Sequence, residues 1–163
     1  MFENPVVKFD DLNQQQSRSW YKAQIKDAKI HIKGSFYKDS ICYENNIAAF
    51  RLVELLKLNT HDDLFLKDIA SVLKNLRGHY SFIIETPYIT IAAVDRIRTY
   101  PIYYSEHKNV FISNSASIIQ KECGLKNIDN LSHLEFRMSG FVTDRNTLFS
   151  GLYQLLPGEF VYY

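Results

Sequence analysis

The sequence predicts an α+β fold, a layered sandwich of sheets and helices, from three observations. Aromatic residues make up 14% of the chain, with eleven Tyr and eleven Phe against six Gly and four Pro, and aromatic rings suit the pleated, half-buried surface of a sheet. Several stretches show the period-two or continuous apolar pattern of strands. Helical patterns interrupt these stretches without strict β-α-β alternation, which favours α+β over α/β architecture.

The first part of the chain carries strand patterns. Residues 6–9 form a short apolar run that predicts a strand, and the polar residues 13–19, rich in Gln and Ser, predict a loop. Residues 29–34 alternate polar and apolar side chains, which predicts a half-buried strand that ends at Gly34.

Two helices are expected next. Residues 46–58 place apolar side chains at helical spacing, with Asn46 available as the N-cap. A second helix begins at Thr60, which has capping-box spacing to Asp63. The apolar side chains expected to be buried in the two helices are Ile47, Ala48, Phe50, Val53, Leu55, Leu56, Phe65, Leu66, Ile69, Val72, Leu73 and Leu76.

The pattern then returns to strands. Residues 80–84 and 89–94 predict a hairpin, and residues 102–104 and 110–112 predict a second one. Because these runs are nearly continuous in apolar residues, we expect the sheet to be covered on both faces.

The last part of the chain predicts two more helices and a final strand. Residues 113–122 form a helical pattern closed by Gly124, and residues 132–138 form another, with Ser132 and Glu135 at capping-box spacing. Residues 159–163 predict the final strand.

Composition and charge exclude several classes of function. The 163 residues suit one domain, 1–163, and the net charge of +1 gives no long-range field to attract nucleic acid or an anionic membrane. No apolar run reaches the roughly 18 residues of a membrane span and the first residues do not resemble a signal peptide, so we expect a cytoplasmic protein. Cys42 and Cys123 suggest neither a disulfide framework nor a zinc site, and His61, Asp62 and Asp63 cannot converge on one ion, so no metal is expected.

Three stretches resemble one family. Residues 93–104 are similar to the A-R-D-x-x-G-x-x-P-L-Y-Y segment of asparagine synthetases and other class II glutamine amidotransferases, and residues 76–82 to that family's L-x-G-M-F-A-F. Residues 139–158 resemble its G-Y-V…T-I-F-x-G-I…L-x-P-G segment, in the same order and spacing. The resemblance implies the N-terminal-nucleophile (Ntn) hydrolase fold, an αββα sandwich of two antiparallel sheets between helical layers. The motif residues, expected to be structural, are Gly78, Asp95, Arg96, Pro101, Gly140, Gly151, Pro157 and Gly158.

The catalytic residues of that family are not matched. Its nucleophile is a cysteine exposed at the N-terminus after Met removal, whereas this chain has Phe2, whose bulk is also expected to prevent Met removal. Cleavage before Cys42 would expose a cysteine, but it would remove the strand that carries Gly34. We therefore predict that there is no catalytic residue for glutamine hydrolysis.

The glutamine-binding elements of the family are also altered. Lys33 and Gly34 stand where the family has Asn-Gly, whose side-chain and backbone donors hold the oxyanion. The flexible side chain of a lysine does not hold a hydrogen-bond donor in a fixed position as the amide of an asparagine does. We expect the Lys33 side chain to point into solvent. The segment before this strand is too short for the arginine motif that binds the glutamine carboxylate, and Asn45 and Asn46 replace the acidic amine anchor. Asp95 and Arg96 are expected to form a structural salt bridge.

The resemblance therefore implies a degenerate amidotransferase-like domain with a scaffold or docking role in an ATP-dependent, amide-forming enzyme. ATP and Mg are expected only in a missing synthetase domain, because the S-G-G-x-D-S loop is absent from residues 1–163, and this domain itself is expected to need no cofactor. Expected partners are a C-terminal synthetase domain, in cis or in trans, and a second copy of the chain in a homodimer. Because the chain stops within the strand after Gly158, we expect a longer polypeptide. Two alternatives stay open: an active glutaminase with a misassigned start, and a free-standing interaction module.

Overall fold

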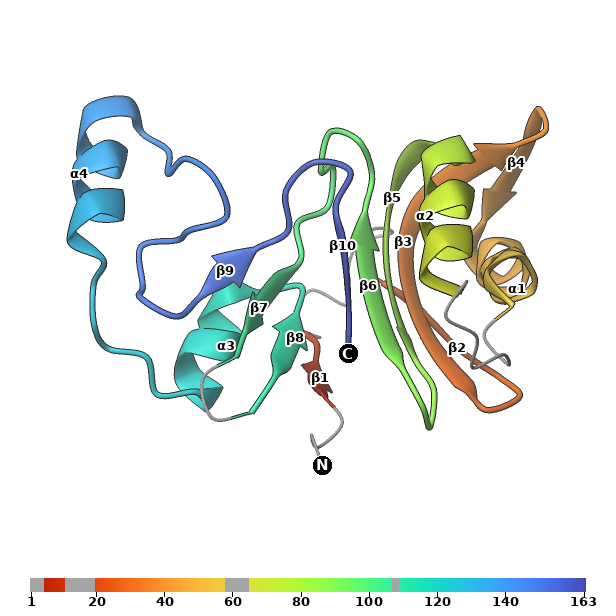
Figure 1. Ribbon diagram of the computed structural model, residues 1–163, viewed down its shortest axis with the longest axis horizontal. Coiled ribbons are helices and arrows are strands. Elements are labelled where there is room, and N and C mark those ends of the chain that lie inside the picture. Colours follow the sequence, from red (N-terminus) through yellow and green to blue (C-terminus); the bar gives the residue numbers. More distant parts are fainter. Residues whose placement is uncertain (1–4, 11–19, 58–64, 107–108) are drawn as a thin grey trace.

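Two stacked sheets lie at the centre of the molecule, with helices outside each of them (Figure 1). The computed structural model describes residues 5–10, 20–57, 65–106 and 109–163, without the side chains of residues 65 and 66. This arrangement confirms the predicted α+β class and its αββα layering. Phe2, the loop at residues 13–19 and the Thr60–Asp63 capping box, with His61 and Asp62, lie outside the described residues.

The larger sheet has six strands and is antiparallel throughout. Its order is β10-β6-β5-β3-β2, and β4 pairs with β3 beside that path. The longest pairing runs from Lys29↔Glu85 to Tyr37↔Arg77. Its strands are β2 (Tyr21–Ile25), β3 (Ala28–Lys38), β4 (Ile41–Glu44), β5 (Arg77–Glu85), β6 (Thr90–Val94) and β10 (Phe160–Tyr162).

The smaller sheet has four strands in the order β1-β8-β7-β9. The β7–β8 and β7–β9 pairs are antiparallel, but β1 runs parallel to β8, with Val6 opposite Phe111. This sheet is therefore mixed and not antiparallel as predicted, because its outermost strand comes from the start of the chain and is not joined to β8 by a hairpin. Its strands are β1 (Val6–Lys8), β7 (Tyr103–Ser105), β8 (Phe111–Ser113) and β9 (Tyr153–Gln154).

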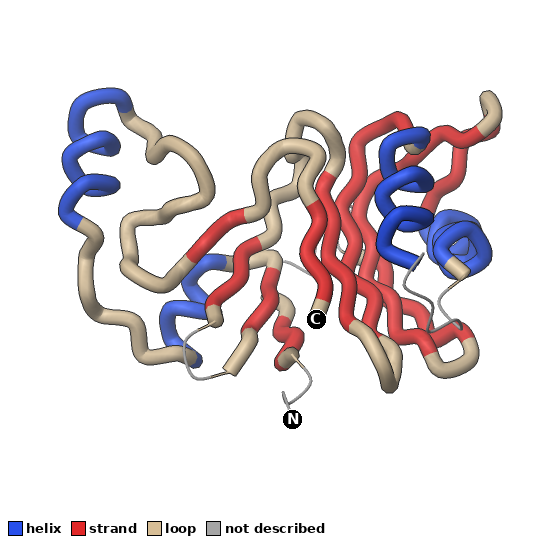
Figure 2. Tube along the Cα trace, viewed as in Figure 1, coloured by secondary structure: helices blue, strands red, loops and turns tan. Residues whose placement is uncertain are grey.

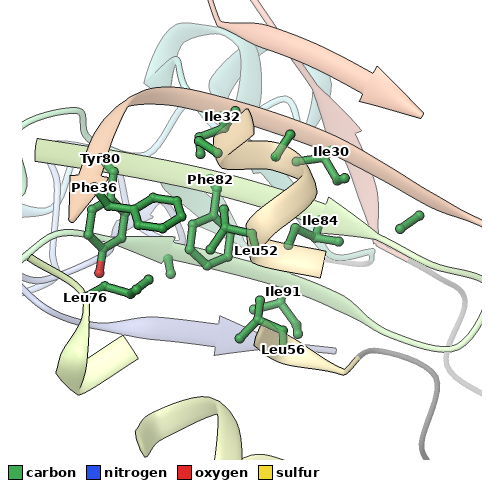
Figure 3. Close-up of a cluster of buried hydrophobic side chains, with 14 of the residues drawn as sticks. Ile30, Ile32, Phe36, Leu52, Leu56, Leu76, Tyr80, Phe82, Ile84 and Ile91 are labelled. Carbon is green, nitrogen blue, oxygen red and sulfur yellow. The ribbon is translucent and has the colours of Figure 1, made fainter. Parts of the chain in front are cut away.

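Helices α1 (Asn45–Leu56) and α2 (Phe65–Asn75) cover the outer face of the larger sheet. The core beneath them joins β3, β5 and β6 to Leu52 and Leu56 of α1 (Figure 3). Alternate residues of β3 point into this core, as period-two geometry requires. The fully buried side chains drawn there include Ile30, Ile32, Phe36, Leu52, Phe82, Ile84 and Ile91.

A second core lies between the sheets. Ile83 and Ala92 of the larger sheet pack with Tyr104 and Ile112 of the smaller sheet and with Ile102 just before β7. All residues from Tyr80 to Ile84 and from Thr90 to Val94 are buried, which confirms that these two strands are covered on both faces.

Helix α3 (Ala116–Glu122) packs on the outer face of the smaller sheet through Ile119. Helix α4 (Asn130–Ser139) stands at the edge of the molecule, with a long loop on either side (Figure 2). Asp129 is the N-cap of α4 and accepts a hydrogen bond from the Ser132 N–H at 2.8 Å, so the predicted Ser132 cap was wrong. Glu135 instead accepts hydrogen bonds from Thr143.

Helix α1 packs inward with only part of the predicted set. Ala48 and Leu56 are buried as predicted, and Val53 and Leu55 are partly buried against the core. Ile47 and Phe50 are instead 60% and 58% exposed, and Ala49 and Leu52, which were not in the predicted set, are buried. Glu44, not Asn46, is the N-cap residue of α1, and its side chain makes no capping hydrogen bond.

Strand β3 also differs from its prediction, because it continues through Gly34 to Lys38. The ladder with β5 is continuous there, and a glycine can take the positive φ of 87° without interrupting it. Strands β2 and β4 were not predicted. β4 lies beside the main path of the sheet and is mostly exposed, so it lacks a buried apolar pattern.

Candidate functional site

The degenerate glutamine site predicted at Lys33 and Gly34 lies on β3, where the ladder with β5 sets its neighbours. Lys33 is opposite Ser81, and Ser35 is opposite His79. His31 lies opposite Ile83, whose side chain belongs to the core between the sheets, so residues 31, 33 and 35 share the inter-sheet face. Lys33 therefore faces the space between the two sheets, at the end of the ladder where polar side chains replace apolar ones.

Gly34 has no room for a side chain. A Cβ at this position would come within 1.9 Å of the His79 carbonyl oxygen and within 2.7 Å of Cε2 of Tyr100. The backbone of β5 and the Tyr100 ring thus contact Gly34 directly. The glycine is required both by its positive φ and by this close approach.

The Lys33 side chain lies over an aromatic ring and is only partly exposed to solvent. The residue is half-buried, and its Nζ lies 5.1 Å from the centroid of the Tyr100 ring. An ammonium over an aromatic face is a cation–π contact. The prediction that Lys33 points into solvent was therefore wrong, because the motif stretch at residues 93–104 supplies an aromatic partner that β3 alone does not reveal.

Two hydrogen bonds hold the segment that carries Tyr100. The Ser81 hydroxyl donates to the Tyr100 carbonyl oxygen, and Nδ1 of His79 lies 3.0 Å from the Thr99 hydroxyl. Ser81 and His79 are both on β5, so the strand that pairs with β3 also fixes the loop above it. Lys33, Gly34 and Tyr100 thereby form one packed unit, which we call the Tyr100 cover.

Asp95 organises the turn that follows β6. Its buried carboxylate accepts hydrogen bonds from the backbone N–H groups of Tyr80, Ile97 and Thr99 at 3.1, 2.8 and 3.0 Å. Its carbonyl oxygen accepts from the N–H groups of Arg98 and Gly158. Burial, together with the charge of Asp95, raises the pKa of the Tyr80 hydroxyl to about 12.

Arg96 is not the partner of Asp95. Its guanidinium donates to the Lys74 carbonyl oxygen at 2.6 Å, next to the end of α2, so the predicted Asp95–Arg96 salt bridge was wrong. Backbone N–H groups satisfy the Asp95 carboxylate instead. Arg98 stands where the family motif has its glycine, and it has a left-handed backbone with a φ of 54°.

The remaining motif residues lie at turns and strand contacts. Gly78 has a φ of 130°, and a Cβ there would come within 2.5 Å of the Ser35 carbonyl oxygen, so its close approach is between adjacent strands of one sheet. Gly140 ends α4 with a left-handed backbone, and its N–H donates to the Phe136 carbonyl oxygen. The other motif residues are Pro101 before β7, Gly151 before β9, and Pro157 and Gly158 before β10.

Neither cysteine lies in the inter-sheet space. Cys42 is exposed on β4, with its Sγ 3.9 Å from a Glu44 carboxylate oxygen. Cys123 follows α3 on the outer face of the smaller sheet, where burial raises the pKa of its thiol. Cysteine nucleophiles are instead activated by positive neighbours that favour the thiolate.

Sequence reasoning missed a buried histidine on the same inter-sheet face. His31 is 3% exposed, stacks on Phe9 with ring centroids 4.0 Å apart, and has its Nε2 3.5 Å from a Glu85 carboxylate oxygen. Burial opposes ionisation of Glu85, but His31 and the Lys29 ammonium hold the pKa of the carboxyl below its usual value of 4.5. The alternating pattern of residues 29–34 suggested a solvent face, whereas Phe9 covers it.

Within the described ranges, no group of three or more His, Cys, Asp or Glu side chains could hold a metal ion. The same part of the chain has no helix long and apolar enough to cross a membrane.

Comparisons with solved structures give likenesses at the level of the fold. No protein-family model and no curated protein matches the chain. Over 90% of the chain, the structure is similar to glutamine phosphoribosylpyrophosphate amidotransferase from B. subtilis in complex with ADP and GMP, with a TM-score of 0.44, 15% identity and 29% of that chain covered. A structure described as the allosteric regulatory enzyme of purine biosynthesis gives a TM-score of 0.42 and 15% identity, with 28% of its chain covered. The chain thus spans less than a third of either protein, and likenesses at this level assign no activity.

Proposed function

We propose that this chain is a glutamine amidotransferase-like domain that does not hydrolyse glutamine. In this proposal it has a scaffold or docking role for an asparagine synthetase-like enzyme, which forms amides at the expense of ATP. ATP and Mg would be bound by the synthetase partner, in cis or in trans, and not by this domain.

The observation that carries the proposal is the turn at Asp95. Its carboxylate and carbonyl bind Tyr80 from the first motif stretch, residues 97–99 from the second and Gly158 from the third. Stretches that resemble one family in sequence thus meet around one buried carboxylate. This supports an architecture shared with that family, because the turn is built from residues that lie far apart in the chain.

Loss of glutaminase chemistry is supported by the Tyr100 cover. Gly34 stands at the position of the family's oxyanion glycine, and the Tyr100 ring packs against it with Lys33 above the ring. An oxyanion site needs donors that are open to the reacting carbonyl.

The proposal is tested by glutamate release. Purified chain is incubated with glutamine at high enzyme concentration, and glutamate is measured against a buffer control and an active glutamine amidotransferase assayed in parallel. We expect no release above the buffer control. Release that disappears in the double variant Cys42→Ser/Cys123→Ser would overturn the proposal and would favour an active amidotransferase.

A further inference from the structure

Strand β4 has one edge without a partner among the described residues. It pairs with β3 on one side, and no other described strand pairs with it. Figure 1 shows the β3–β4 hairpin at a corner of the molecule. The strand lacks the lysine, proline or bulge that protects many natural edge strands. It contains one charged residue, Glu44, and its Ile41 side chain is 56% exposed. An edge of this kind is open to pairing with another strand.

The hairpin geometry fixes which backbone groups face the open edge. Asp39 and Ser40 form a two-residue turn, both with positive φ, and Lys38 pairs with Ile41 across it. In such hairpins the closing pair exchanges two hydrogen bonds and the next pair exchanges none. The backbone N–H and C=O groups of Cys42 therefore point away from β3. Cys42 thus presents one donor and one acceptor at the open edge.

A second copy of the chain satisfies both groups at once. When two β4 strands lie antiparallel about a two-fold axis at Cys42, each Cys42 N–H donates to the carbonyl oxygen of the partner's Cys42. The same register places Ile41 opposite the partner's Tyr43. These side chains lie on the face of the sheet that carries α1, since Tyr43 is opposite Phe36 of the core beneath that helix. Pairs of an aromatic and a β-branched side chain across antiparallel strands are stabilising.

Charge favours this register over its neighbours. Glu44 falls opposite the partner's Ser40, so the two Glu44 side chains are separated by four residues along the strands, roughly 13 Å. A shift by two residues keeps the hydrogen bonds in phase, but in one direction it places Glu44 opposite the partner's Cys42 and brings the two carboxylates close together, where they repel. In the other direction it places Tyr43 opposite the partner's Asp39 and loses both Ile–Tyr pairs. The register centred on Cys42 avoids both costs.

We propose that β4 pairs with β4 of a second copy of the chain, which joins the two larger sheets edge to edge in a homodimer. The proposal goes beyond the proposed function and does not depend on whether glutamine is hydrolysed. Because one short strand buries little surface, the dimer is weak, with an expected dissociation constant of roughly 100 μM.

Sedimentation velocity tests the dimer, with the chain at concentrations from about tenfold below to about tenfold above that value and with cysteines kept reduced. The parent chain should shift from monomer to dimer across this range. Ile41→Lys places a charge opposite the partner's Tyr43 and should weaken dimerisation at least about tenfold. The matched control is Ile47→Lys, which introduces the same charge at an equally exposed position on α1 and should leave dimerisation unchanged. Both positions are exposed, so thermal melts of the two variants at low concentration should match that of the parent chain.

Cys42 gives a second readout, because the proposed register places the two Cys42 Cα atoms about 5.5 Å apart, within reach of a disulfide. In chains that carry Cys123→Ser, mild oxidation should join the two Cys42 side chains at least about tenfold faster than it joins chains that also carry Cys42→Ser/Ser71→Cys, whose exposed cysteine lies on α2. Peptide mass spectrometry identifies the linked residues. A monomer at every concentration, a dimer that Ile41→Lys leaves intact, an equal loss in Ile47→Lys, or equal rates of oxidation would each overturn the proposal.

Discussion

The ring of Tyr100 lies against Gly34, so that a Cβ on the glycine would come within 2.7 Å of Cε2 of the tyrosine. Gly34 is on β3 and Tyr100 is in the motif stretch at residues 93–104, 66 positions further along the chain. This contact places an aromatic ring against Gly34, with the Lys33 Nζ 5.1 Å from the ring centroid. It is the structural observation that supports the proposed loss of glutaminase activity.

Gly34→Ala should destabilise the protein severely. The new Cβ would meet the His79 carbonyl oxygen at 1.9 Å in a backbone with a φ of 87°. We expect a loss of about 3 kcal/mol or more in the free energy of unfolding, measured by urea titration. Gly124→Ala is the control, because its φ is also positive but no atom lies within 4 Å of the added Cβ, and it should cost only about 1 kcal/mol. Equal losses in the two variants would contradict the close approach.

Arg98→Gly should stabilise the protein. Arg98 has a φ of 54°, a left-handed conformation that favours glycine. The substitution should raise the free energy of unfolding by about 0.5–1 kcal/mol. Arg98→Ala keeps the Cβ and should give no such gain, so thermal melts of the two variants separate backbone strain from loss of the charge. A stabilising effect of both substitutions would attribute the gain to the guanidinium.

Asp95→Asn should destabilise the turn. The buried carboxylate accepts three backbone hydrogen bonds through two oxygens, and an amide would present an N–H group to at least one of these donors. We expect a loss of about 3 kcal/mol in chemical denaturation, because hydrogen bonds to charged groups are strong and a buried donor would be left unpaired. An unchanged denaturation midpoint would show that the turn does not depend on Asp95.

Glu85 should make stability depend on pH. Its pKa is lowered in the folded state, so its contribution is present above its usual value of 4.5 and is lost as pH falls through the lower folded value. Unfolding free energies of the parent chain and of Glu85→Gln, measured from pH 6 down to acid, should converge below that range. Parallel curves at all pH values would show that the contacts of Glu85 with His31 and Lys29 do not contribute.

Local patterns predicted the elements whose contacts are local. The β5–β6 and β7–β8 hairpins follow from apolar runs separated by short polar segments, and both formed as expected. The buried face of α1 was predicted only in part, since Ile47 and Phe50 are exposed while Ala49 and Leu52 are buried. Apolar side chains lie all around this helix, so their spacing does not fix which side meets the sheet.

The candidate site could be predicted only in part. The motif spacing located Gly34 and Asp95, but the partner of Lys33 is Tyr100, 67 positions away in the sequence, and no local pattern joins them. His31 was missed for the same reason, since Phe9 from another segment covers it. Contacts between segments far apart in the sequence define this site, so the three-dimensional structure is needed to find them.

The central claim, that the chain cannot attack glutamine, is tested most directly by covalent labelling with a diazoketone analogue of glutamine, read by intact mass spectrometry. We predict an unchanged mass, with neither Cys42 nor Cys123 labelled beyond the level that a simple alkylating control without the amino-acid group gives. A single adduct per chain that forms faster than this control and is blocked by excess glutamine would contradict the account.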